Sequence, residues 1–162
     1  MHEELFAQVE PDLPRLAEWV NARFKATVYQ DPYSPFCLLA ADNGEADAIY
    51  DYLDRYSQSV PNLAVVRNDV YARFSHVAYN KGTALAELAR RLNLTAEQVF
   101  AAGDHLNDVP MLSRKYARCL AAPQNAVEPI KSLVRSQNGF VSSLPHGDGV
   151  AEALEFYLSS GA

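Results

Sequence analysis

The sequence is poor in features that mark several classes of protein. Its two cysteines, Cys37 and Cys119, lie far apart and lack metal-binding spacing, so we expect reduced structural thiols in a cytoplasmic protein. No apolar run approaches the roughly 20 residues needed to span a bilayer, and the acidic start has no apolar signal-peptide core. These absences argue against a secreted, disulfide-rich or membrane-spanning chain.

Positive charge is also scarce. The chain carries 14 Lys and Arg against 20 Asp and Glu, giving a net charge of −6, and has no long basic run. Proteins that bind a nucleic-acid backbone ordinarily gather Lys and Arg on one face, so we expect no nucleic-acid partner. With 49% hydrophobic residues, the 162-residue chain can form one ordinary domain or two small ones.

The hydrophobic pattern predicts an α/β fold with two differently organised regions. Residues 12–79 read as helix, two strands, helix and two strands. The second half alternates helices with short apolar strands, a pattern typical of parallel βαβ units in an open sheet. The change of pattern near Asn80 divides the chain into residues 1–79 and 80–162. In the helix that starts the second region, we expect four residues to face inward: Leu85, Leu88, Ala89 and Leu92.

A pair of aspartates stands out in "AAGDHLNDVPML", residues 101–112. Asp104 and Asp108 are four residues apart and follow the apolar run "VFAA". Neighbouring carboxylates repel each other, so a stable arrangement needs an interaction that offsets the repulsion. A divalent cation is one such compensation, and a solvated turn with a helix cap is the other.

The position of this pair favours a ligand site. In open α/β sheets, ligands bind beyond the carboxyl ends of the strands, and Gly103 allows a sharp turn there. We expect Asn107 and Asp108 to open the following short helix, whose N-terminus favours anions. Mg²⁺ is commonly held by one or two carboxylates together with phosphate oxygens. The spacing therefore suits a site that holds a metal ion and a phosphate together.

The segment "KGTALAELARRLNLTAEQVFAAGDHLNDVPML" resembles the C-terminal half of the haloacid-dehalogenase-like (HAD) phosphatases. It is most similar to their sugar-phosphate phosphatase branch, which includes the sucrose-phosphate phosphatases. The G-D-x-x-N-D-x-x-M-L motif is matched from Gly103 to Leu112, and the family's K-G pair by Lys81 and Gly82. "PQNAVEPIK" is similar to the next family segment, although Pro123 stands where glycine is usual. The resemblance implies a partial Rossmann-like HAD core after an α+β cap portion.

The resemblance also implies roles for individual residues. Asp104 would ligate Mg²⁺ directly, and Asp108 would hold it through water or a second contact. Asn107 would face the phosphoryl group or the nucleophile, and Lys81 would neutralise negative charge during phosphoryl transfer. The substrate would be a phosphorylated small molecule such as a sugar phosphate. Asn125 is most simply a helix cap, and a supporting role near the metal is the alternative.

One part of the family pattern is absent. The family's nucleophile is the first aspartate of a D-x-D motif, and no D-x-D occurs in the sequence. Asp42 follows an apolar strand, but Gly44 occupies the second aspartate's position, so we interpret Asp42 as a turn residue. We therefore expect little or no turnover by this chain, the front half being supplied by a longer natural protein or a partner chain. The alternatives are a non-catalytic pseudophosphatase that acts as a binding or scaffold module, and a hydrolase with another nucleophile.

The absent front half has a consequence for association. Without the central strands of the family core, "VFAA" and "ARCLAA" would have an unpaired edge and an uncovered face. We expect a homodimer or a partner chain to cover them, or the strands of the first half to repack there.

Overall fold

The computed structural model describes residues 2–160 and divides the chain into two compact units, one ending at Tyr79 and the other beginning at Asn80. The mixed α/β fold expected from the sequence is confirmed, with an antiparallel sheet in the first unit and a parallel sheet in the second. Across residues 2–160, no helix has the length and apolar character required to cross a membrane.

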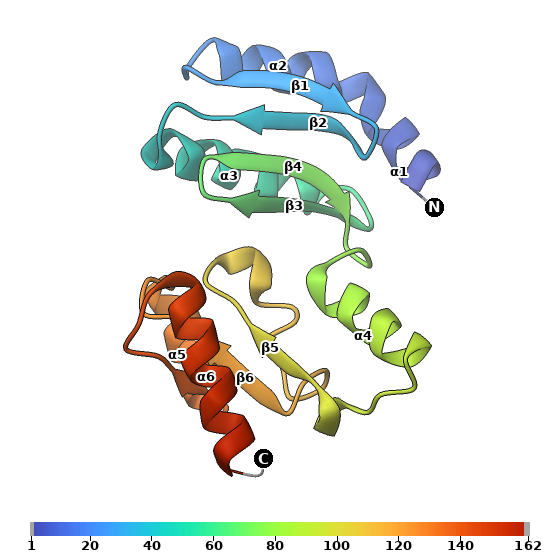
Figure 1. Ribbon diagram of the computed structural model, residues 1–162. Coiled ribbons are helices and arrows are strands. Elements are labelled where there is room, and N and C mark those ends of the chain that lie inside the picture. The colour runs from blue at the N-terminus through green and yellow to red at the C-terminus, as the bar shows by residue number, and fades with distance from the viewer. Residues whose placement is uncertain (1, 161–162) are drawn as a thin grey trace. The chain divides into compact units, whose positions relative to one another are not determined.

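The first unit is a four-stranded antiparallel sheet with helices against one face (Figure 1). The strand order is β1-β2-β4-β3, so β1 and β3 form the two edges. Its elements, in chain order, are α1 (His2–Val9), η1 (Glu10–Asp12, a 3₁₀ turn), α2 (Leu13–Asn21), β1 (Thr27–Asp31), β2 (Ser34–Leu39), α3 (Asn43–Ser57), β3 (Leu63–Asn68) and β4 (Tyr71–His76).

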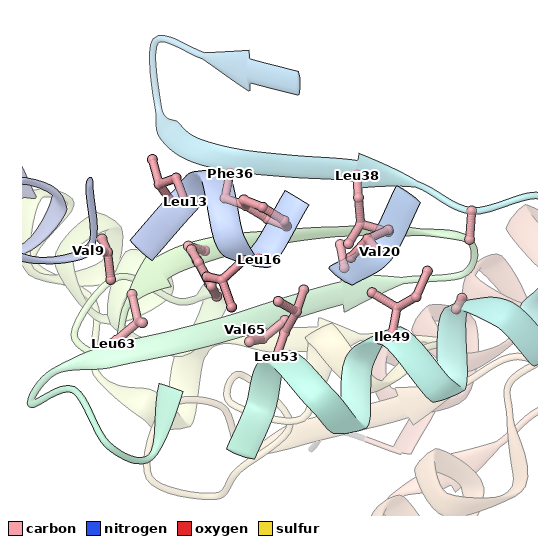
Figure 2. Close-up of a cluster of buried hydrophobic side chains, with 14 of the residues drawn as sticks. Val9, Leu13, Leu16, Val20, Phe36, Leu38, Ile49, Leu53, Leu63 and Val65 are labelled. Carbon is pink, nitrogen blue, oxygen red and sulfur yellow. The ribbon is translucent and has the colours of Figure 1, made fainter. Parts of the chain in front are cut away.

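The core of this unit lies between the sheet and its helices, as Figure 2 shows. Leu16 and Val20 share one face of α2, and Ile49 and Leu53 share one face of α3, because residues four apart lie on the same side of a helix. All four are fully buried together with Phe74 of β4. Side chains alternate along a strand, so the neighbours of Phe74 point to the opposite face of the sheet.

The beginning of the chain differs from the sequence prediction, which placed no helix before residue 12. Helix α1 forms there because Leu5 and Val9, which are four residues apart, both enter the core. Asp42 is the N-cap of α3, which begins at Asn43, and not the turn residue expected from the sequence, because its side chain accepts a hydrogen bond of 2.9 Å from the Glu45 amide.

The second unit is a three-stranded parallel sheet in the order β5-β6-β7. Its elements, in chain order, are α4 (Lys81–Arg91), η2 (Ala96–Gln98), β5 (Phe100–Ala102), η3 (Leu106–Asp108), β6 (Cys119–Ala122), α5 (Glu128–Ser136), β7 (Phe140–Val141) and α6 (His146–Ser160).

Two helices are joined to this sheet by specific contacts. Ile130 and Val134 of α5 are fully buried in one core cluster with Leu120 of β6. The Tyr157 hydroxyl of α6 donates to the Leu120 carbonyl at 2.9 Å and accepts from the Phe140 amide at 3.1 Å. Burial raises the pKa of Tyr157, so the hydroxyl keeps its proton and bridges β6 and β7.

Helix α4 corrects part of the sequence prediction. Leu85 and Ala89 pack against the core of the second unit, but Leu88 and Leu92 are 54% and 58% exposed, so the prediction that all four face inward is wrong. The two sheets are also separate, with β1–β4 in one and β5–β7 in the other. Within residues 2–160, no strand of the first unit pairs with β5. Helical spacing identifies an apolar face but not the element that covers it.

Candidate active site

The aspartate pair lies on a tight turn directly after β5. Gly103 donates a backbone hydrogen bond to the Ala121 carbonyl at 3.2 Å, which extends the pairing of β5 with β6 by one residue. The chain then forms η3, which ends at Asp108. The prediction that Asn107 and Asp108 open a helix is therefore wrong, because the Asp108 amide already donates to the His105 carbonyl at 2.9 Å and closes the turn.

The Asp108 carboxylate is the centre of this turn. One oxygen, Oδ2, accepts hydrogen bonds from the backbone amides of Asp104 at 2.9 Å and His105 at 3.2 Å. The other, Oδ1, pairs with Nζ of Lys81. The Asp108 side chain is only 4% exposed, whereas that of Lys81 is 49% exposed. A buried carboxylate thus holds a half-exposed ammonium group at the end of the parallel sheet.

Two glycines of the family motifs allow this close packing. A Cβ atom on Gly103 would lie 2.5 Å from Cβ of Asp108, so only glycine leaves room for the buried carboxylate. A Cβ on Gly82 would lie 2.2 Å from the Pro110 carbonyl oxygen. The start of α4 therefore rests directly on the backbone that follows Asp108, which brings Lys81 to the turn.

The first turn of α4 is held by a reciprocal cap that sequence reasoning missed. The Asn80 side chain accepts from the Thr83 amide at 3.0 Å, and the Thr83 hydroxyl accepts from the Asn80 amide at 3.1 Å. The signal was present as the Asn-x-x-Thr spacing at the start of "NKGTALAEL". The cap fixes the backbone of Lys81, the first residue of α4.

Asp104 is positioned by its neighbours rather than by burial. Its backbone carbonyl accepts from the Val127 amide at 2.9 Å, and its exposed carboxylate lies 3.5 Å from Nδ2 of Asn125. The other end of Asn125 accepts from the His146 amide at 2.5 Å. Helix α5 is preceded by Val127 at its N-cap, so Asn125 does not cap that helix and instead lies beside Asp104.

The carboxylates fit part of a Mg²⁺ site. The Asp104 oxygens are exposed, and hard oxygen donors are what Mg²⁺ prefers. Asn107 is half-buried, and its side chain forms no hydrogen bond to another residue in the range 2–160. Both Asp108 oxygens already have partners. In the part of the chain that the structure describes, no three His, Cys, Asp or Glu side chains gather closely enough to hold a metal ion.

Comparison with known proteins places this turn in a family. The family model for haloacid dehalogenase-like hydrolases matches residues 19–154. The chain belongs to the haloacid dehalogenase-like hydrolase family. The match includes Lys81 and the whole segment from Gly103 to Leu112, so the resemblance drawn from these motifs is confirmed.

This HAD-like chain is similar in sequence to curated phosphatases and similar in fold to several solved structures. A phosphoglycolate phosphatase from Methanoculleus marisnigri is 41% identical over 78 residues, which are 48% of this chain and 31% of the relative. A haloacid dehalogenase-like hydrolase from B. subtilis has a TM-score of 0.57 at 27% identity, over 74% of this chain and 39% of that one. The structure of the sucrose-phosphatase of Synechocystis, in complex with sucrose and phosphate, has a TM-score of 0.62 at 17% identity. The match covers 89% of this chain and 62% of that one. The HAD-like chain thus spans about a third of the length of the phosphoglycolate phosphatase.

Proposed function

We propose that this chain carries the Lys81 and Asp104 side of the active site of a Mg²⁺-dependent phosphatase that acts on a phosphorylated small molecule such as a sugar phosphate. The observation that carries the proposal is the buried Asp108 carboxylate, which fixes Lys81 and the backbone of Asp104 at the end of β5. The phosphatase names of the relatives support the same reaction class.

Each residue then has a definite task. Lys81 contacts the phosphoryl oxygens and neutralises charge that develops on them during transfer. Asp108 keeps the Lys81 ammonium in place, because its own second oxygen is held by two backbone amides. Asn107 donates its amide hydrogens to the phosphoryl group or to the nucleophile.

Asp104 would hold Mg²⁺, with Asp108 as a second carboxylate that contacts it through water. When bound, the ion would draw negative charge from the phosphoryl oxygens. Asn125, beside the Asp104 carboxylate, limits the orientations that this side chain adopts.

The residue that accepts the phosphoryl group is proposed to come from outside these 162 residues, because no D-x-D motif is present. In the complete enzyme, an aspartate would attack phosphorus, the alcohol would leave, and water would hydrolyse the aspartyl phosphate. By itself the chain is therefore expected to be inactive.

A chimera tests this proposal. Residues 80–160 would replace the equivalent segment of the Methanoculleus marisnigri phosphoglycolate phosphatase, and hydrolysis of p-nitrophenyl phosphate would be followed with and without Mg²⁺. We expect turnover by the chimera only with Mg²⁺, and none by the isolated chain above its Asp104→Ala variant. A folded but inactive chimera would contradict the proposal and favour the non-catalytic binding or scaffold function.

The open edge of the second sheet leads to a proposal about association. Among residues 2–160, β5 pairs with β6 alone. Three leucines of the same unit, Leu88, Leu92 and Leu94, are 54%, 58% and 38% exposed. In the complete enzyme, the part that carries the nucleophile would cover these groups. In its absence, a second copy of this chain would cover them.

Light scattering during size-exclusion chromatography checks this association. We expect the mass of a dimer for the isolated chain and of a monomer after the double change Leu88→Gln and Leu92→Gln, because these changes remove apolar surface that is already exposed. The matched control is the variant Leu158→Gln, because Leu158 is an exposed leucine of α6. We expect this variant to remain a dimer. A stable monomer of the unaltered chain would refute the proposal.

A further inference from the structure

The first unit contains a cavity of about 520 Å³ whose described lining residues all belong to that unit. Its walls come from α1, the turn between β1 and β2, the end of β4 and Tyr79. The volume lies within the range of about 300–1,000 Å³ that is common for sites of small molecules.

Strand β4 presents two polar side chains to the cavity. Phe74 is fully buried in the core on one face of the sheet, so its neighbours Arg73 and Ser75 point to the other face. Ser75 is 3% exposed and Arg73 is half-buried. The cavity wall therefore carries a guanidinium group and a hydroxyl group two residues apart on a rigid strand.

The charge of Arg73 has no close partner. Asp31 interacts with it electrostatically, but among residues 2–160 no carboxylate oxygen lies within 4.0 Å of the guanidinium, and the Arg73 side chain forms no hydrogen bond. The Asp31 carboxylate is itself engaged, since it accepts from the Tyr33 amide at 2.7 Å. A half-buried guanidinium whose donors are unpaired is suited to binding an anion.

The remaining walls are largely aromatic. Phe6 of α1 is half-buried, and Tyr33 and Tyr79 are 72% and 46% exposed. Large aromatic side chains at a cavity supply apolar area and favour stacked or edge-on contact with a ring. These walls complement a flat, apolar ligand body, and Arg73 complements a negative group at one end of it.

We propose that this cavity binds a small aromatic carboxylate. Arg73 donates two parallel hydrogen bonds to the carboxylate, and Phe6 and Tyr33 contact the ring. The Ser75 hydroxyl donates to the Tyr79 carbonyl at 3.5 Å and contributes a polar wall rather than a bond to the ligand. Glu3 also borders the cavity, but it is exposed. Its charge opposes the anion only through solvent and weakens binding modestly.

Benzoate and its neutral isostere benzamide test the proposal. Each would be titrated into the ¹⁵N-labelled 162-residue chain, with the amide resonances of residues 73–79 and 31–34 as reporters. We expect benzoate to shift these resonances and to bind about tenfold more tightly than benzamide, because only the anion forms charge-assisted bonds. Equal affinities for the two compounds, or no shifts with benzoate, would overturn the proposal.

Three variants locate the interaction. Arg73→Gln should weaken benzoate binding about tenfold, whereas Arg55→Gln on the exposed side of α3 should leave it unchanged. Glu3→Gln should strengthen it about twofold because a repulsive charge is removed. Unchanged binding by folded Arg73→Gln, or weaker binding by Glu3→Gln, would overturn the proposal. If Arg73→Gln does not fold, Glu3→Gln and the comparison with benzamide decide the question.

Discussion

Replacing Asp108 with alanine should lower the free energy of unfolding of this chain by about 3 kcal/mol. The carboxylate is almost fully buried and accepts from the amides of Asp104 and His105. Alanine leaves both amides without an acceptor, at about 1–3 kcal/mol each when buried. Rupture of the pair with Lys81 adds little, because that side chain is half-exposed and returns to water. Urea unfolding followed by circular dichroism gives the value.

Two further variants separate the causes of this loss. Asp108→Asn retains an oxygen that accepts from the two amides and loses only the charge. We therefore expect it to lower the free energy of unfolding by about 1 kcal/mol. Glu97→Ala removes an exposed carboxylate paired with Arg118 at 3.1 Å and should change stability by less than about 0.5 kcal/mol. Amide hydrogen exchange at Asp104 and His105 should accelerate in Asp108→Ala but not in Glu97→Ala. An Asp108→Ala chain as stable as the unaltered one would exclude the anchoring role of this carboxylate.

Replacing Lys81 with methionine should reduce kcat/KM of the chimeric phosphatase by about 10²–10³-fold. Methionine keeps the length and apolar stem of the side chain and removes the charge that we assign to the phosphoryl group. The loss should therefore come from charge stabilisation and not from the packing of α4 against the turn. Steady-state kinetics with p-nitrophenyl phosphate at saturating Mg²⁺ measure this effect.

The matched control is Lys115→Met. Lys115 is exposed in the same unit, and its ammonium lies 5.0 Å from the Tyr116 ring without contacting the aspartate turn. We expect kcat/KM of this variant to stay within about twofold of the parent chimera. If Lys81→Met were as active as Lys115→Met, Lys81 would be a structural partner of Asp108 and nothing more.

Local sequence chemistry was a good guide to the strands. Short apolar runs bounded by turn residues marked β2, β3, β5 and β6, because such runs must be buried on at least one face. Gly103 was expected to allow a sharp turn, and the structure adds that the Asp108 side chain lies where its Cβ would be. Gly82 was matched only as part of the family's K-G pair, and the structure places the Pro110 carbonyl where its Cβ would be.

The errors arose where a distant residue decides the local structure. Helix α1 depends on Leu5 and Val9 entering a core built from later elements. The turn ending at Asp108 is held in place by the Asp108 carboxylate, which accepts from the His105 amide and pairs with Lys81, 27 residues earlier. Asn125 lies beside Asp104 instead of capping α5, a contact across 21 residues. Periodicity and propensity carry no information about such partners.

By itself, the sequence determined the α/β class, the family and the identity of the residues at the end of β5, since these depend on short patterns and on motif spacing. The tertiary structure decided how these residues act together. Asp108 becomes the buried anchor and Asp104 the exposed carboxylate because the glycines let α4 rest on the turn. Which of two similar aspartates is enclosed depends on what packs over it, and that is a property of contacts between segments far apart in the chain.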